Sequence, residues 1–148
     1  MKHFNQDGLS FSYPDEWTIE REGAAGGWTV TIQSPGTAVA IVTLDREMPE
    51  IEEVARTTLD ALKEDYPSLE ATSALETIAG ELAVGHDVEF FSFDLTVNCT
   101  TRCFYGAAGT VLILCQVSGM DEEEYGPALG AIRVMSASTP HSRSTASA

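Results

Sequence analysis

The residues of this sequence whose types suggest chemistry are three cysteines and one histidine–aspartate pair. Cys99, Cys103 and Cys115 could hold a metal or exchange electrons, and His86-Asp87 could act in acid–base catalysis. Cys99 and Cys103 are four residues apart in one predicted strand, about 13 Å by strand rise, which exceeds disulfide reach. No Cys-x-x-Cys pair is present. We therefore interpret the cysteines as buried structural thiols, with a redox or metal role as the alternative.

Neighbouring residues of a strand point to opposite faces, so His86 and Asp87 are not expected to act together. Cys115 lies opposite Cys99 only if the turn between their strands has three residues; a turn of two or four residues would separate them. His86 alone does not complete a metal site with these cysteines. A hydrolase or redox protein that uses His86 or Cys103 remains one hypothesis, and it requires these groups to converge in a cleft.

The other polar motifs have structural explanations. Asp121 and Glu124 have the spacing of a helix capping pair and lack the spacing of a calcium loop. The glycine-rich segment 23–27 precedes a strand pattern, whereas a phosphate cradle needs a helix after it. No Gly-x-Ser-x-Gly elbow surrounds the serines considered, which are Ser10, Ser12 and Ser118. The sequence therefore predicts no catalytic, metal-binding or cofactor-binding residues and no cofactor, and it does not assign the protein-binding residues.

Composition limits the class of partner. The chain has 148 residues, with 23 acidic and 8 basic side chains and a net charge of -15. Nucleic acid and anionic membranes would be repelled by this charge, whereas a basic protein would be attracted. The start of the chain has no apolar signal core, and the cysteine count is odd, so we expect a cytoplasmic protein without membrane insertion. We expect another protein as partner, and a monomer or homodimer.

The segment Thr110–Ser118, TVLILCQVS, organises the predicted fold. It is apolar on both faces and is bounded by Gly109 and Gly119 at the length of a strand. A strand of this kind needs cover on both faces and belongs near the middle of a sheet. Leu114→Ala is then expected to cost about 2–5 kcal/mol of folding free energy.

Alternating and helical patterns predict the remaining elements. Two helices are expected, one from Pro49 to about Tyr66 and one after Gly119 that begins as late as Gly126. Seven further strands are expected, at about 9–13, 18–22, 28–33, 38–44, 69–78, 82–95 and 97–105. In the strand 82–95 the apolar phase changes from Val84, Val88 and Phe90 to Phe91, Phe93 and Leu95. This predicts that the second set also faces inward, through a bulge or through cover on both sides of the sheet.

One domain is expected over residues 1–136, with a disordered polar tail over 137–148. Trp17 and Trp28 are interpreted as core residues, with a binding platform as the alternative. The remaining predicted core consists of Phe11, Tyr13, Val30, Ile32, Ile41, Leu59, Leu62, Phe91, Leu112, Leu114, Leu129 and Ile132.

The segment Gly8-Leu9-Ser10-Phe11-Ser12-Tyr13-Pro14-Asp15-Glu16-Trp17 resembles the opening of the PsbP-like superfamily. That superfamily includes the photosystem PsbP proteins, the Mog-type Ran-binding proteins and the bacterial DcrB-like proteins. The resemblance continues through Gly80 before paired long strands to a final helix near Ser136, and it covers about residues 4–136. It implies an α+β fold, in which an antiparallel sheet of about seven or eight strands lies between helices. It also implies binding or assembly rather than enzymatic activity.

Three functions are therefore considered. The first is a non-enzymatic protein-binding module, adaptor or chaperone; some cytosolic DcrB-like proteins of this size are chaperones for secreted effectors. The second is a small-ligand-binding protein with a pocket between sheet and helix. The third is the hydrolase or redox protein already described.

Overall fold

The computed structural model describes residues 1–137, which form ten strands and two helices. The elements are, in chain order, β1 (Lys2–Gln6), β2 (Leu9–Tyr13), β3 (Thr18–Ala24), β4 (Gly27–Gln33), β5 (Val39–Asp45), α1 (Ile51–Asp65), β6 (Glu70–Ile78), β7 (Glu81–Ser92), β8 (Leu95–Tyr105), β9 (Thr110–Ser118), α2 (Glu122–Arg133) and β10 (Ser136–Ala137).

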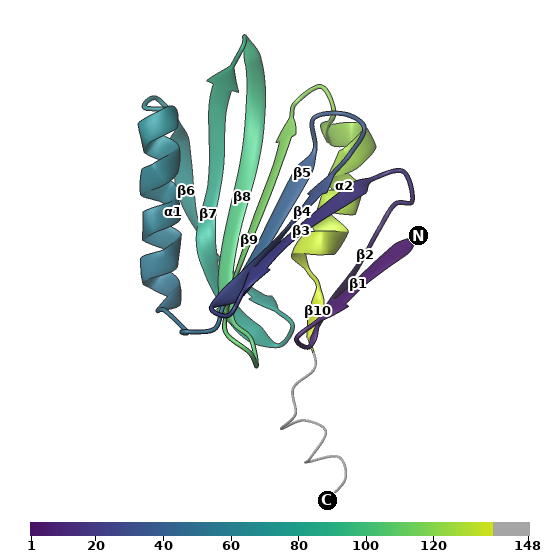
Figure 1. The fold of residues 1–148 in the computed structure, drawn as a ribbon. Coiled ribbons are helices and arrows are strands. Elements are labelled where there is room, and N and C mark those ends of the chain that lie inside the picture. Colours follow the sequence, from purple (N-terminus) through teal and green to yellow (C-terminus); the bar gives the residue numbers. More distant parts are fainter. Residues whose placement is uncertain (138–148) are drawn as a thin grey trace, which may run out of the picture.

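Seven strands form one antiparallel sheet in the order β3-β4-β5-β9-β8-β7-β6, and β1, β2 and β10 form a separate small sheet (Figure 1). β9 is the fourth of the seven strands and pairs with β5 on one side and β8 on the other. The predicted α+β class and the central position of this strand are confirmed. β3 and β6 are therefore the two edge strands of this sheet.

The largest core lies on the sheet face that is covered by α2 and the small sheet. Every second residue of β9 points into it: Val111, Ile113, Cys115 and Val117 are at most 5% exposed. The predicted core tryptophans, Trp17 and Trp28, also lie in this cluster. Apolar side chains from strands, α2 and the small sheet thus pack around one row of β9 residues, which fixes both layers against the sheet.

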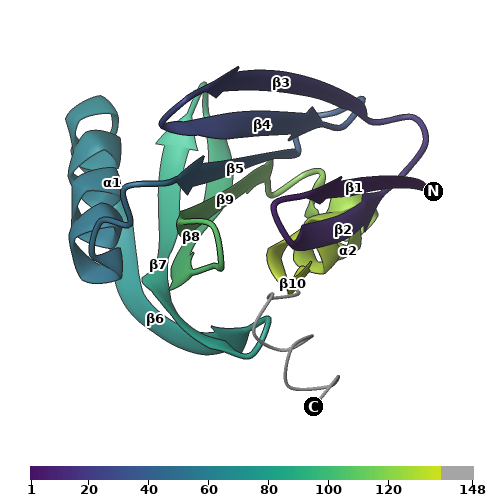
Figure 2. The same ribbon diagram turned by 60° about the horizontal axis from the view of Figure 1, so that its bottom comes forward.

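Helix α1 covers the opposite face of β7, β8 and part of β9. Its apolar stripe includes buried Ile51 and Ala55, with Leu59 and Leu62 packed against a smaller cluster around Phe90. The cover does not extend over the whole face. Figure 2 shows β3 and β4 at the top, to the right of α1, with no helix above them.

The part of this sheet face that α1 leaves uncovered, on β3, β4 and β5, is mostly polar. The residues that face outward there include Thr29, Thr31 and Thr43, beside Glu20 and Glu22 of the edge strand. Val39 and Ile41 of β5 are only partly buried on this face. The predicted arrangement of helices on both faces is therefore confirmed, but one helix covers only half of its face.

Both helix starts differ from the sequence prediction. Glu50 is the N-cap of α1, so Pro49 lies before the helix rather than in its first turn. Helix α2 begins at Glu122, not near Gly126, because Tyr125 N–H already donates to the carbonyl of Asp121 at 2.9 Å. Three glutamates in the first turn favour this earlier start through the helix dipole.

The prediction that the side chains of Phe91 and Phe93 face inward is wrong. Phe93 and Asp94 have φ angles of 51° and 64° and form the two-residue turn between β7 and β8. Two positive φ values are the signature of a type I′ hairpin turn. Phe91 is 68% exposed and Phe93 is 97% exposed, so both project from the hairpin tip rather than into the core.

Three further boundaries were mispredicted. Strand β1 was not predicted, although it pairs with β2 through a tight turn at Asp7-Gly8. The segment 23–27 is a hairpin with only Ala25 and Gly26 outside the strands, rather than a flexible loop. Ala137, which the sequence analysis assigns to the tail, belongs to β10 and pairs with Leu9 of β2. The rest of the predicted tail, 138–148, lies outside the described residues.

The exposure of β9 residues predicts unequal effects of truncating its two faces. Ile113 is fully buried, whereas Leu114 is only partly buried below α1. Ile113→Ala should cost about 2–5 kcal/mol. For Leu114→Ala, the same cost expected from the sequence is corrected to about 1–2 kcal/mol, because the partly buried side chain has less buried apolar surface to lose. Urea denaturation of both variants measures the difference, and a larger loss for Leu114→Ala would contradict this assignment of the two faces.

The turn at Phe93 predicts a stabilising substitution. A phenylalanine in left-handed backbone is strained, and asparagine tolerates that region far better. Phe93→Asn should raise the free energy of unfolding by about 0.5–1.5 kcal/mol, since an almost fully exposed ring has little packing to lose. Ser92→Asn is the matched control beside it, at a residue without positive φ, and should change stability little in the same thermal and urea unfolding measurements.

Candidate functional site

A groove between α1 and the edge strand β6 is the strongest candidate site. It has a volume of about 430 Å³ and is lined by α1, β6 and β7. Because α1 sits over β7 and β8, the face of β6 beside it remains open. Ala55 and Leu59 line the helix side, and Leu75 and Val84 line the sheet side. The groove is therefore mainly apolar and accessible from outside.

Exposed leucines extend this apolar surface to the edge of the molecule. Leu75 is 69% exposed and Leu82 is 54% exposed. The register of β6 and β7 pairs Leu75 with Val84 and Thr77 with Leu82, so both leucines lie on the groove face. We refer to Leu75, Leu82 and Val84 together with the α1–β6 groove as the groove face.

His86 is the most unusual polar residue of the groove. Its Nδ1 atom is buried and has no hydrogen-bond partner among the described residues. Burial lowers the pKa of His86 below its ordinary value of 6.5, and the positive charges of Lys63 and Arg102 lower it further, opposed by Asp87. The lowered pKa favours the neutral ring, and the unpaired Nδ1 is enclosed by neighbouring atoms rather than exposed in the groove.

Gly85 allows β7 to form the floor of this groove. A Cβ atom at this position would overlap the backbone carbonyl oxygen of Thr101 on β8. The two strands therefore approach closely here, and His86 N–H also donates to the hydroxyl of Thr101 at 3.0 Å. This close approach fixes the backbone that carries His86.

Asp87 points to the other face of the sheet, as the sequence predicted for neighbours in a strand. There its carboxylate accepts from Arg102 at 2.9 Å. Arg102 is 6% exposed, and its Nε also donates to Glu76 of β6 at 2.7 Å. Arg133 of α2 donates to the same Glu76 oxygen at 3.1 Å. This charge network is structural: it neutralises a buried guanidinium and joins β6, β8 and α2.

The structure does not bring the cysteines together with His86 in an open site. All three are buried free thiols. Burial raises the pKa to about 12 for Cys99 and Cys103 and to about 11 for Cys115, so the reactive thiolate is scarce at neutral pH. Cys115 pairs with Thr100 rather than with Cys99 and faces the other side of the sheet. Among the described residues, no group of three or more metal-ligating side chains is arranged to hold an ion.

Asp121 does not cap its helix with its side chain. Its carboxylate instead accepts from the Thr37 N–H at 2.8 Å and the Thr37 hydroxyl at 2.7 Å. These two bonds lower the pKa of Asp121. The predicted capping pair with Glu124 is therefore wrong, because the Asp121 carboxylate instead connects the β4–β5 turn to the start of α2.

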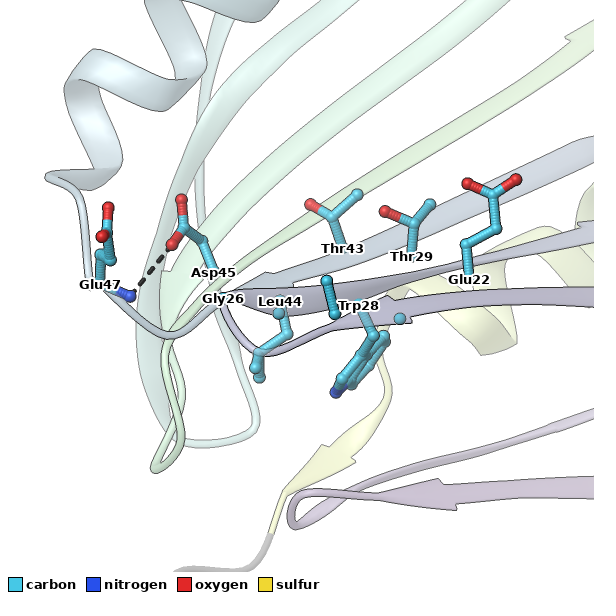
Figure 3. A pocket seen from close by; sticks show the side chains of 11 residues that line it. Glu22, Gly26, Trp28, Thr29, Thr43, Leu44, Asp45 and Glu47 are labelled. Carbon is cyan, nitrogen blue, oxygen red and sulfur yellow. Dashed lines mark hydrogen bonds between the residues drawn. The ribbon is translucent and has the colours of Figure 1, made fainter.

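A second hollow, of about 610 Å³, lies at the β3–β4 hairpin and the end of β5 (Figure 3). Glu22, Asp45 and Glu47 point to one side of it, and Trp28 and Leu44 point to the other. Trp28 is 6% exposed and its indole N–H donates to Asp7 at 2.7 Å, so the ring is part of the core and not a binding platform. With its acidic, threonine-lined surface, this hollow has no feature beyond its charge that indicates a ligand.

The comparisons with known proteins concern the fold. No protein-family model and no curated protein matches the sequence. Solved structures match along most of this chain. CyanoP, the PsbP of the cyanobacterium Synechocystis sp. PCC 6803, has a TM-score of 0.62 and 11% identity over 93% of this chain and 92% of its own. The chain has the PsbP-like fold.

Two further structures agree. LpqN, which is involved in cell envelope biogenesis of Mycobacterium tuberculosis, has a TM-score of 0.56 and 11% identity over 86% of this chain and 82% of its own. A protein of Bacteroides thetaiotaomicron has a TM-score of 0.56 and 15% identity over 95% of this chain and 49% of its own. The resemblance seen in the opening segment is thus confirmed for the PsbP-like fold. A fold shared at such low identity does not transfer a function.

The groove face was not predicted from the sequence. The sequence indicates the chemistry of His86 and predicts β6 as a strand, but the position of both beside α1 depends on how far the helix extends across the sheet. Leu75, between Ala74 and Glu76, carries no local signal that distinguishes an exposed leucine from a buried one.

The lowered pKa of His86 predicts a specific dependence of stability on pH. As pH falls through about 6.5, the unfolded chain takes up a proton that the native His86 does not, so the free energy of unfolding decreases. His86→Leu should reduce this decrease between pH 7.5 and pH 5.5, because the substituted side chain does not titrate. Urea unfolding across this range measures both slopes, and equal slopes would contradict the assignment to His86.

Proposed function

We propose that this protein is a non-enzymatic protein-binding module, an adaptor or chaperone, which holds part of its partner on the groove face. The observation that carries this proposal is the uncovered apolar surface formed by Leu75, Leu82 and the α1–β6 groove. Exposed apolar surface of this kind costs free energy in water, and covering it favours association.

Charge supports a partner with basic side chains. The protein carries a net charge of -15, and no lysine or arginine occurs between Lys63 and Arg102, the segment that contains all of β6 and β7. The groove itself is lined by one acidic and one basic side chain, Glu52 and Arg56, so the attraction comes from the net charge of the molecule. This net charge would accelerate association with a basic partner and disfavour nucleic acid. The three free thiols support a reducing compartment, and we place the protein in the cytoplasm. Among residues 1–137, no helix is long and apolar enough to cross a bilayer.

A second candidate function is the binding of a small apolar ligand in the same groove. The mainly apolar lining favours it, and His86 is a lining residue whose imidazole adds a polar group to this surface. The volume of about 430 Å³ is within the range of small-molecule sites. Native mass spectrometry of the protein purified from its own cells distinguishes the two: a retained small molecule, displaced by a groove-filling substitution, favours the ligand.

Affinity capture with a blocked groove tests the protein-binding function. Ser73 is exposed and lines the groove, so Ser73→Trp should fill part of it without removing core packing. We expect a reproducible partner in the native lysate with the unsubstituted protein and a loss of at least about tenfold with Ser73→Trp.

Thr31→Trp is the control, because it adds the same side chain to the same sheet face on the side that α1 leaves open. It should leave the recovered amount unchanged. Equal recovery with the two variants would reject the groove as the binding surface, and recovery of no partner would reject the proposed function.

A further inference from the structure

The edge of β6 lacks the features with which proteins usually prevent strand addition. Among the described residues, β6 pairs only with β7, over nine consecutive residues without a bulge. It contains no proline and no lysine. Every second residue of an edge strand directs its N–H and C=O away from the sheet, so β6 presents a row of unused backbone donors and acceptors.

The two acidic side chains of β6 do not shield this edge equally. Glu76 is drawn to the face opposite the groove, where Arg102 and Arg133 hold its carboxylate. Glu70, at the start of the strand, takes part in none of the ion pairs among residues 1–137. The central part of the edge, from Ala71 to Leu75, is therefore uncharged.

The start of β6 holds an unfavourable charge pair. Glu70 is directly opposite Glu89 of β7, and both side chains are exposed. Like charges at directly opposed positions destabilise an antiparallel pair. A lysine or arginine on the outer side of Glu70 would compensate this repulsion, and a neighbouring strand would place such a residue about 5 Å away.

The groove face supplies the side-chain contacts for such a strand. Residues of an added strand alternate between the two faces of the sheet, so every second side chain would lie beside Leu75 and the groove in front of it. Apolar side chains at these positions would cover the exposed surface of Leu75. Backbone hydrogen bonds, apolar contacts and one charge contact thus converge on the same edge.

We propose that β6 accepts an extended segment of a partner protein as an added strand, with alternate apolar side chains in the groove and a lysine or arginine beside Glu70. This inference rests on the protein-binding function proposed above and specifies the chemistry of the bound segment. A second copy of this chain is a poorer occupant, since its own β6 contains no basic residue and it adds a further charge of -15.

A synthetic peptide of sequence KVTVTLTVK, labelled with fluorescein, is a direct probe of this mode. Its valines and leucine alternate with threonines, and its lysines lie at the ends. Fluorescence anisotropy should show saturable binding, weakened at least about tenfold in KVTPTLTVK, because proline removes a backbone donor. The same weakening is expected for EVTVTLTVE, which adds negative charge beside Glu70.

Two protein variants connect this binding to β6. Leu75→Lys should weaken the affinity for KVTVTLTVK at least about tenfold, because it places a charge in the apolar surface. Val134→Lys is the control at an exposed valine after α2, and it should leave this affinity unchanged. Glu70→Lys should reverse the preference so that EVTVTLTVE binds more tightly than KVTVTLTVK. Hydrogen exchange should slow for amides of residues 71–77 when KVTVTLTVK is bound.

Three outcomes would overturn the proposal. The first is peptide binding that Leu75→Lys and the proline leave unchanged. The second is no binding of KVTVTLTVK although the capture experiment recovers a partner that Ser73→Trp loses. Protein binding in the groove would then be supported, and strand addition would be rejected. The third is a dimer in light scattering that Leu75→Lys dissociates, which would assign the edge to a second copy. Absence of both peptide and partner binding would reject the proposed function as well.

Discussion

The structure depends on the burial of one strand on both sides. Side chains on one face of β9, including Ile113 and Val117, are packed under α2 and the small sheet, and side chains on the other face lie under α1. Neither layer alone could keep this strand from water. Because β9 is in the middle of seven strands, the two layers need to be thick only near the centre of the sheet. The outer strands are then left with partial cover.

This uneven cover explains where the accessible surfaces are. Helix α1 has 15 residues and lies over β7 and β8, so one side of it faces the threonine-rich half of the sheet and the other faces β6. The first surface is polar and suits contact with water. The second retains Leu75 and the groove, and it is there that an apolar surface and a free strand edge coincide.

Much of the fold follows from periodicity in the sequence, but the candidate site does not. Alternation at Trp28, Val30 and Ile32 predicts a strand correctly, and the helical stripe from Ile51 predicts α1. The misplaced elements were decided by turns: a type I′ turn at Phe93 has no glycine or asparagine to announce it. Strand β1 could have been found, since Asp7-Gly8 is a strong hairpin signal. The groove depends on the distance between α1 and β6, which no local pattern encodes.

The charge network at Glu76 has a consequence for the edge strand itself. Terminal strands of sheets commonly fray, but separating β6 from β7 would also withdraw Glu76 from Arg102, leaving a guanidinium that is 6% exposed with one fewer anionic partner. Arg133 opposes the same movement from α2. The outermost strand is thereby anchored to the interior by electrostatics near its C-terminal end, and this end stays preorganised even though every second residue of the strand directs its backbone groups to solvent.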